Sequence, residues 1–187
     1  TATEAHTCID VQTGNAVVHE AAHARTPLSG GALDLAAAAG LPVTWRRPTE
    51  RFDEGLVGAW RAAGRAALVI RGGSAGQLDV DASRAMASAI LRVIAHAGLI
   101  APPDQGAPGT VTADVQAYRS GVGGFFVPEV RAGERVPGGK LLGLVRSPVG
   151  GDPLESIHAT RGGMVLAVRQ YPVVHARELL VRVAEGG

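Results

Sequence analysis

The stretch Cys8-Ile9-Asp10-Val11-Gln12-Thr13-Gly14 organises this chain. Small apolar and β-forming residues come first, and the polar, turn-forming residues Gln12, Thr13 and Gly14 follow where a strand would stop. In open α/β sheets, ligands bind beyond the carboxyl ends of the strands. The stretch therefore predicts a strand whose end carries binding side chains, and the alternative is a strand followed by an ordinary turn.

Composition limits the classes of protein to consider. The 187 residues are enough to bury a core, and 46% of them are hydrophobic although only 4% are aromatic. The net charge of +1 predicts no general affinity for nucleic acid or for a membrane surface. The single cysteine, Cys8, excludes an intrachain disulfide and a cysteine-based zinc cluster. We recognise no signal peptide and no bilayer-spanning apolar run, so we expect a cytoplasmic protein.

The segment His19-Glu20-Ala21-Ala22-His23 matches the H-E-x-x-H pattern of zinc peptidases. Residues 15–24 are predicted to form a short helix that begins with an asparagine cap. On such a helix His19 and His23 would share one face and bind one zinc ion, with Glu20 as general base. The other interpretation is a polar turn of helix without metal, because no convincing third ligand follows.

Helix and strand patterns alternate up to residue 100, which is typical of an α/β domain. Helices are predicted at 31–40, 54–63 and 84–98, the last capped by Ser83, and strands at 41–46 and 65–71. The glycine turn at 72–76 lacks the lysine and the spacing of phosphate-binding loops, so nucleotide binding is not predicted.

A Pro- and Gly-rich linker is predicted at 101–109, and the pattern changes after it. From residue 110 onward, short strands separated by turns predict a small all-β module over 110–187. The expected strands are 112–117, 124–130, 141–145, 155–159, 163–169 and 179–183.

Four glycine-containing stretches stand out in this module: Gly123-Gly124-Phe125-Phe126-Val127-Pro128, Ala132–Val136, Gly139–Gly143 and Gly162–Val165. Together they resemble the C-terminal domain of the succinylglutamate desuccinylase/aspartoacylase family, zinc amidohydrolases with a carboxypeptidase-like α/β domain. Upstream, 68–79 resembles the family's strand and glycine turn, 85–100 its outgoing helix, and 9–14 its third zinc-ligand strand. The resemblance implies a partial carboxypeptidase-like α/β layer over 1–100 and a β barrel-sandwich module over 110–187.

The chain departs from the family at its reactive positions. Gln12 stands where the resemblance expects a histidine zinc ligand, and Arg71 where it expects the general-base glutamate. A neutral amide is a poor zinc ligand, and a guanidinium cannot take a proton from water at neutral pH. The His-Gly-x-x-Glu run that supplies the family's first two ligands is not found in the sequence.

The resemblance therefore implies an N-acyl amino acid amidohydrolase scaffold that is catalytically divergent or acts as one half of a two-chain hydrolase. Zinc is the cofactor that the family implies, and a small N-acylated amino acid is the implied ligand. The expected substrate-binding residues are Asp10, Gln12, Thr13 and Arg71, of which Arg71 would bind a carboxylate rather than act as a base.

Two alternatives stay open. One is a zinc metalloenzyme that uses His19 and His23 as ligands and Glu20 as a catalytic base. The other is a non-enzymatic interaction subunit. In each case we expect a second chain, either an N-terminal half or another copy, because a partial sheet exposes a strand edge and apolar faces.

Overall fold

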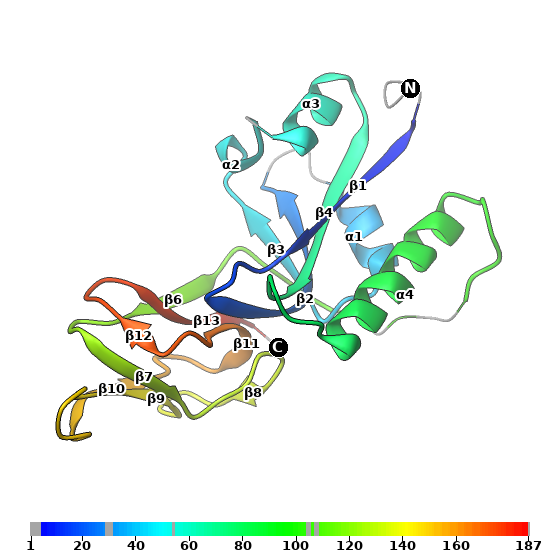
Figure 1. The fold of residues 1–187 in the computed structure, drawn as a ribbon. Helices are drawn as coiled ribbons and strands as arrows, with labels where there is room; N and C mark the ends of the chain where they lie inside the picture. The colour runs from blue at the N-terminus through cyan, green and yellow to red at the C-terminus, as the bar shows by residue number, and fades with distance from the viewer. Residues whose placement is uncertain (1–4, 29–31, 54, 104–105, 107–108, 187) are drawn as a thin grey trace. The chain divides into compact units, whose positions relative to one another are not determined.

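The structure is a computed structural model that describes residues 5–28, 32–53, 55–103, 106 and 109–186 (Figure 1). The chain divides into two compact units, each built from separate segments. The first, the α/β unit, takes Thr1–Thr13, Ala22–Gly72 and Asp79–Ala113. The second, the β unit, takes Gly14–Ala21, Gly73–Leu78 and Asp114–Gly187. Within the described residues, no helix is long and apolar enough to cross a membrane.

The sheet of the α/β unit has the strand order β1-β4-β2-β3-β5. Its strands are β1 (Thr7–Thr13), β4 (Ala66–Gly73), β2 (Val18–Pro27), β3 (Val43–Arg47) and β5 (Thr110–Thr112). Strand β1 runs parallel to β4, and β3 runs parallel to both β2 and β5. The helices are α1 (Leu33–Ala39), α2 (Glu50–Asp53), α3 (Leu56–Ala62) and α4 (Val80–His96).

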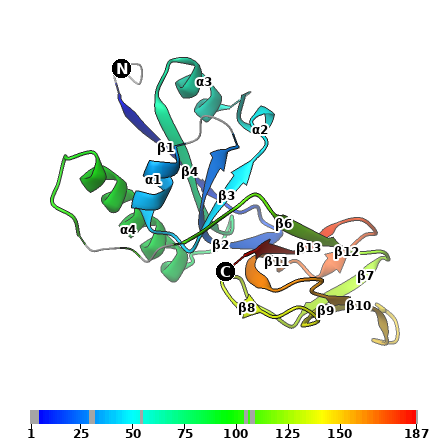
Figure 2. The same ribbon diagram turned by 180° about the vertical axis from the view of Figure 1, so that it is seen from behind.

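Helices cover both faces of this sheet, α1 and α4 one face and α2 and α3 the other (Figures 1 and 2). Alternation along β4 explains this, because Leu68 and Ile70 join the core under α1 and α4. Ala67 and Val69 join the core under α2 and α3. A strand buried on both faces reads as a continuous apolar run, which is the pattern that predicted β4.

The β unit consists of two antiparallel sheets. In one, β11 (Gly163–Arg169) pairs with β13 (Leu179–Glu185), which pairs with β6 (Val115–Arg119). Strand β11 also pairs with β8 (Arg135–Val136) and with Val18–Glu20 of β2. The other sheet has the order β10 (Pro153–His158), β9 (Leu141–Arg146), β7 (Gly124–Pro128) and β12 (Val173–Val174).

The core of the β unit is aliphatic. Leu142 and Val145 of one sheet pack with Val165, Val181 and Val183 of the other, and all five are fully buried. A core of branched aliphatic side chains agrees with the low aromatic content of the sequence. The strand pairings of the described residues form two sheets and show no closed barrel.

Most predicted elements are confirmed. The strand at 8–14 is β1, and the helix at 31–40 is α1, which ends at Gly40 in the left-handed conformation (φ +60°). The strand predicted at 163–169 has those same bounds in β11. Residues 31, 54, 104, 105, 107 and 108, which fall in two predicted helices and the linker, lie outside the described residues.

Two predictions are wrong. Residues 15–24 do not form a helix, because the Asn15 side chain accepts hydrogen bonds from the backbone N–H groups of Val17 and Val18 and closes a turn into β2. Helix α4 is capped by Asp79, which accepts from the backbone N–H of Ala82 at 2.9 Å, and not by Ser83.

Candidate functional site

A hydrogen-bonded chain of three polar side chains lies toward the ends of β1 and β4. The parallel register places Gln12 beside Arg71 and Asp10 beside Val69. Arg71 Nη1 donates to Gln12 Oε1 at 2.8 Å, and Gln12 Nε2 donates to Asp10 Oδ2 at 2.6 Å. The Gln12 amide therefore has its oxygen on a cation and its nitrogen on a carboxylate, which fixes its orientation.

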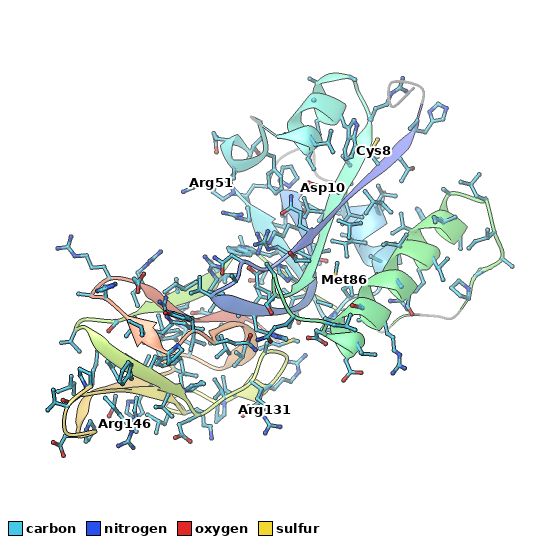
Figure 3. The ribbon with its side chains drawn as sticks, viewed as in Figure 1. Cys8, Asp10, Arg51, Met86, Arg131 and Arg146 are labelled. Carbon is cyan, nitrogen blue, oxygen red and sulfur yellow. The ribbon has the colours of Figure 1, made fainter. Side chains whose placement is uncertain are left out.

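A cavity of about 100 Å³ lies over this face of the sheet. Figure 3 labels two of its lining residues, Asp10 on β1 and Arg51 on α2. Of the residues that the structure describes, the charged ones in its lining are Asp10, Arg25, Arg47 and Arg51, and the others are Gln12, Phe52, Gly55, Leu56, Val57 and Val69. Three arginines and one carboxylate give the described lining an excess of positive charge, which favours an anionic ligand.

Two of the arginines are positioned by Trp45. The guanidinium carbons of Arg25 and Arg47 lie 4.9 and 4.7 Å from the centroid of the Trp45 ring. Arg25 is the cross-strand partner of Trp45, and its Nε donates to His23 Nε2 at 2.8 Å. Cation–π contacts and the bond to His23 hold these two guanidinium groups in defined places before any ligand arrives.

The structure brings together three of the four predicted binding residues, Asp10, Gln12 and Arg71. Thr13 is exposed at the end of β1, and neither Thr13 nor Arg71 is among the residues that line the cavity. Arg71 is connected to the cavity through its hydrogen bond to Gln12. Sequence reasoning missed Arg25, Arg47 and Arg51. Alternation around Trp45 would have found Arg47, since residues two apart on a strand share a face.

The H-E-x-x-H segment does not have the geometry that its pattern requires. On strand β2, four residues correspond to a rise of about 13 Å, so His19 and His23 are too far apart to share one zinc ion. His23 is fully buried and accepts the bond from Arg25, and Glu20 is buried as well. In the described part of the chain, no three His, Cys, Asp or Glu residues gather to hold a metal ion.

The strand ends also do not fit the zinc that the family resemblance implies. The Gln12 oxygen already accepts a hydrogen bond from the Arg71 guanidinium. A divalent cation at that oxygen would lie beside a permanent positive charge and be repelled by it. A neutral amide oxygen is a weak zinc ligand and does not offset this repulsion.

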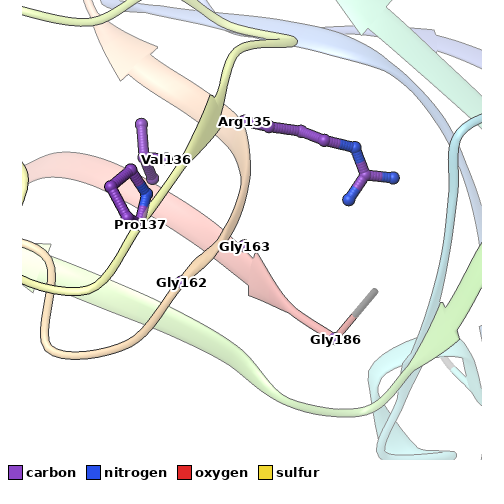
Figure 4. A pocket seen from close by; sticks show the side chains of 6 residues that line it. All are labelled: Arg135, Val136, Pro137, Gly162, Gly163 and Gly186. Carbon is purple, nitrogen blue, oxygen red and sulfur yellow. The ribbon is translucent and has the colours of Figure 1, made fainter.

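A second cavity, of about 400 Å³, lies in the β unit (Figure 4). Arg135, Val136, Pro137, Gly162, Gly163 and Gly186 line it. Arg135 is the only charged residue among them. A single exposed arginine beside glycine backbone supplies neither an acid–base pair nor a metal ligand set, so the first cavity is the better candidate site.

The fold is that of solved structures of succinylglutamate desuccinylases and aspartoacylases. A succinylglutamate desuccinylase/aspartoacylase from Rhodobacter sphaeroides matches with a TM-score of 0.81 and 22% identity, over 100% of this chain and 60% of that one. The product-bound ectoine utilization protein EutE (DoeB) from Ruegeria pomeroyi matches with a TM-score of 0.80 and 17% identity, over 99% and 60%. An aspartoacylase family protein from Mesorhizobium loti gives 0.73 and 16%, over 97% and 58%.

These matches confirm the fold that the sequence resemblance implied, a mixed α/β fold shared with the desuccinylases. The chain spans about three fifths of the length of these solved structures. No family model matches the sequence, and no curated protein matches it either. The likeness is therefore one of fold, and the activity has to be argued from the site.

Proposed function

We propose that this chain is a catalytically divergent amidohydrolase scaffold of the desuccinylase/aspartoacylase type, whose cavity binds a small carboxylate. The ligand class is that of N-acylated amino acids and their dicarboxylate fragments. On this proposal the chain alone does not hydrolyse such compounds, and it requires no zinc. The fold likeness supports the scaffold, and the cavity charges support the ligand class.

The observation that carries the proposal is the hydrogen bond between Arg71 and Gln12. It places a permanent cation where the resemblance expects a proton-accepting carboxylate, and a neutral amide where it expects a metal ligand. A guanidinium binds carboxylates through two parallel N–H groups but does not activate water as a base. Binding is therefore the chemistry that these two positions support, and hydrolysis is not.

The same proposal includes a second protein chain. Among the described residues β1 pairs only with β4, and this edge position and the three-fifths coverage of the solved structures support a partner that supplies further strands, either an N-terminal half or another copy. With such a partner the complex would be a two-chain hydrolase, or this chain would be a non-enzymatic interaction subunit. We further propose a cytoplasmic location and a barrel-sandwich relationship for the β unit.

Calorimetry with N-acetyl-L-aspartate and succinate tests the binding proposal. We expect both to bind, and Arg51→Ala to weaken both by roughly ten- to a hundredfold, because a hydrogen bond to a charged group contributes about 1.5–3 kcal/mol. Arg131→Ala is the matched control, since Arg131 is an exposed arginine of the β unit (Figure 3) and should change neither affinity. Equal affinities in the Arg51 variant and the unsubstituted protein would contradict the proposal.

Co-purification separates the two-chain hydrolase from the interaction subunit. The purified chain is incubated with N-acetyl-L-aspartate, alone and with any protein that co-purifies with it. Release of aspartate only in the presence of the second chain supports the two-chain hydrolase. Release by the chain alone, at a rate that zinc chelation lowers, overturns the proposed divergence.

A further inference from the structure

Asp10 gives the cavity a negative charge, which the binding of carboxylates does not need. Among the lining residues that the structure describes, it is the one acidic side chain, together with the three arginines. A cavity that served carboxylates alone would be weakened by this charge, because like charges repel at short range. The charge is also held in place, since Gln12 donates to Asp10 Oδ2 and Arg71 in turn holds Gln12.

The bond from Gln12 leaves acceptor capacity on Asp10. A carboxylate offers two oxygens and about four acceptor sites, and the Gln12 amide nitrogen uses one of them. An ammonium group is the ligand group that matches such a carboxylate, because it carries the opposite charge and three donors. Guanidinium groups and a carboxylate in one cavity are thus complementary to carboxylates and an ammonium in one ligand.

We propose that the cavity selects a free acidic α-amino acid, which carries two carboxylates and an ammonium, over its N-acylated form. The inference rests on the proposed carboxylate binding and adds Asp10 as the residue that determines specificity. Acylation converts the ammonium into a neutral amide with one N–H. Charge-assisted hydrogen bonds are roughly twice as strong as neutral ones, so the N-acyl compound loses about half of the strength of one hydrogen bond to Asp10. It also loses the attraction between opposite charges and two of the three donors.

The test is calorimetry with two sets of three ligands, each set sharing one carbon-chain length. L-aspartate is compared with N-acetyl-L-aspartate and with succinate, and L-glutamate with N-acetyl-L-glutamate and with glutarate. We expect the free amino acids to bind at least about tenfold more tightly than the compounds without an ammonium. The preference should disappear between about pH 8 and pH 10.5, as the ligand ammonium loses its proton while the dicarboxylates keep their charge.

Asp10→Asn should lower the affinity for the free amino acids and raise the affinity for the dicarboxylates. The asparagine oxygen can still accept from Gln12, so the change removes mainly the charge. The amino acids should bind at least about tenfold more weakly, whereas succinate and glutarate should bind more tightly because a repulsive charge is gone. Asp152→Asn, at an exposed aspartate of the β unit, is the control and should leave all six affinities unchanged.

The outcomes separate this inference from the function on which it rests. Dicarboxylate binding without tighter binding of the free amino acids overturns the selection and leaves the proposed function intact. A preference that survives Asp10→Asn assigns the selection to another residue and overturns the role of Asp10. Absence of binding by every carboxylate overturns the proposed function itself. The pH series uses the unsubstituted protein, so it decides the selection even if the variant does not fold.

Discussion

At the scale of single residues, Gln12 and Arg71 act as a matched pair. The Gln12 amide accepts a hydrogen bond from the Arg71 guanidinium and donates one to the Asp10 carboxylate, so both ends of the amide have a partner. The sequence was sufficient to predict this neighbourhood, because the ends of parallel strands meet at one edge of the sheet. The bond itself depends on the register between β1 and β4, which no local pattern specifies.

The other cavity residues show why the site was only partly predictable. Arg47 and Trp45 share one face of β3. Arg25 directly follows the segment 15–24, whose pattern predicts a helix, so the sequence does not indicate its place on a strand face. Arg51 comes from the four-residue helix α2, which has too few residues to show a period. The three arginines, from β2, β3 and α2, converge only through tertiary packing, so composition and spacing do not reveal them.

A buried arginine organises the turn between β11 and β13. Arg169 is 6% exposed and donates through Nε to the Tyr171 oxygen at 2.9 Å and through Nη2 to the Val173 oxygen at 2.5 Å. The same Nη2 lies 3.0 Å from Glu178 Oε2. The backbone N–H of His175 and the charge of Arg169 lower the pKa of Glu178, even though solvent reaches its carboxylate.

This lowered pKa makes the stability of the chain depend on pH. A carboxylate with a lowered pKa in the folded state contributes stability above its unfolded pKa of about 4.3, and loses it as the pH falls through the folded value. We expect Glu178→Gln to be less stable than the unsubstituted protein at pH 7 and to lose less stability between about pH 5 and pH 3. Urea denaturation across this range measures the difference, and Glu129→Gln, at an exposed glutamate, should reproduce the unsubstituted curve.

At the scale of secondary-structure elements, β2 lies where the sequence predicts a helix, and this prediction is wrong for identifiable reasons. Its alanine-rich sequence is compatible with helix, and an asparagine before it matches a helix cap. The same asparagine side chain instead closes a turn, and pairing with β11 in the β unit satisfies the backbone of Val18–Glu20. Helix propensity is a weak local preference, and cross-strand hydrogen bonds over long sequence distances override it.

The ends of α1 and α3 allow a test of close packing against backbone strain. Gly40 and Gly64 follow the two helices, and both have positive φ, +60° and +71°. A Cβ on Gly40 would lie 2.8 Å from the Cα of Gly106, whereas a Cβ on Gly64 would meet nothing within 4 Å. We expect Gly64→Ala to cost about 1 kcal/mol from strain, and Gly40→Ala about 2–4 kcal/mol because overpacking adds to it.

Thermal denaturation of the two variants measures these costs. The melting temperature should fall clearly more for Gly40→Ala than for Gly64→Ala. Equal decreases would mean that the contact between Gly40 and Gly106 does not contribute, and that left-handed backbone strain alone makes glycine necessary at both helix ends.

At the scale of the whole molecule, each unit is assembled from separate stretches of chain. The sequence predicted one change of pattern after a linker, and the composition there does change. It did not show that residues 14–21 and 73–78 belong with the β strands, or that β5 pairs with β3. Such assignments depend on pairings between distant residues, for which a single sequence carries no local signal.

The edge position of β1 predicts association. Within the described residues β1 pairs only with β4, and its seven residues contain neither the proline nor the lysine that protects many sheet edges. Val11 on this strand is 53% exposed. We expect Val11→Lys to raise the concentration at which the purified chain self-associates by several-fold, as measured by light scattering during gel filtration.

Val149→Lys is the control for this substitution, because Val149 is 97% exposed but lies in the connection between β9 and β10. It adds the same charge away from the edge strand. A similar effect of both variants would attribute the change to net charge and not to the edge of β1.

The contacts of Trp45 with Arg25 and Arg47 make its fluorescence sensitive to ligand binding in the cavity. The chain has two tryptophans, and the other, Trp60, packs against the core under α2 and α3. A ligand that draws either guanidinium away from the indole changes the electric field on that chromophore. With Trp60 replaced by phenylalanine, the fluorescence of the remaining indole becomes an intrinsic optical reporter that registers occupancy of the cavity without any attached label.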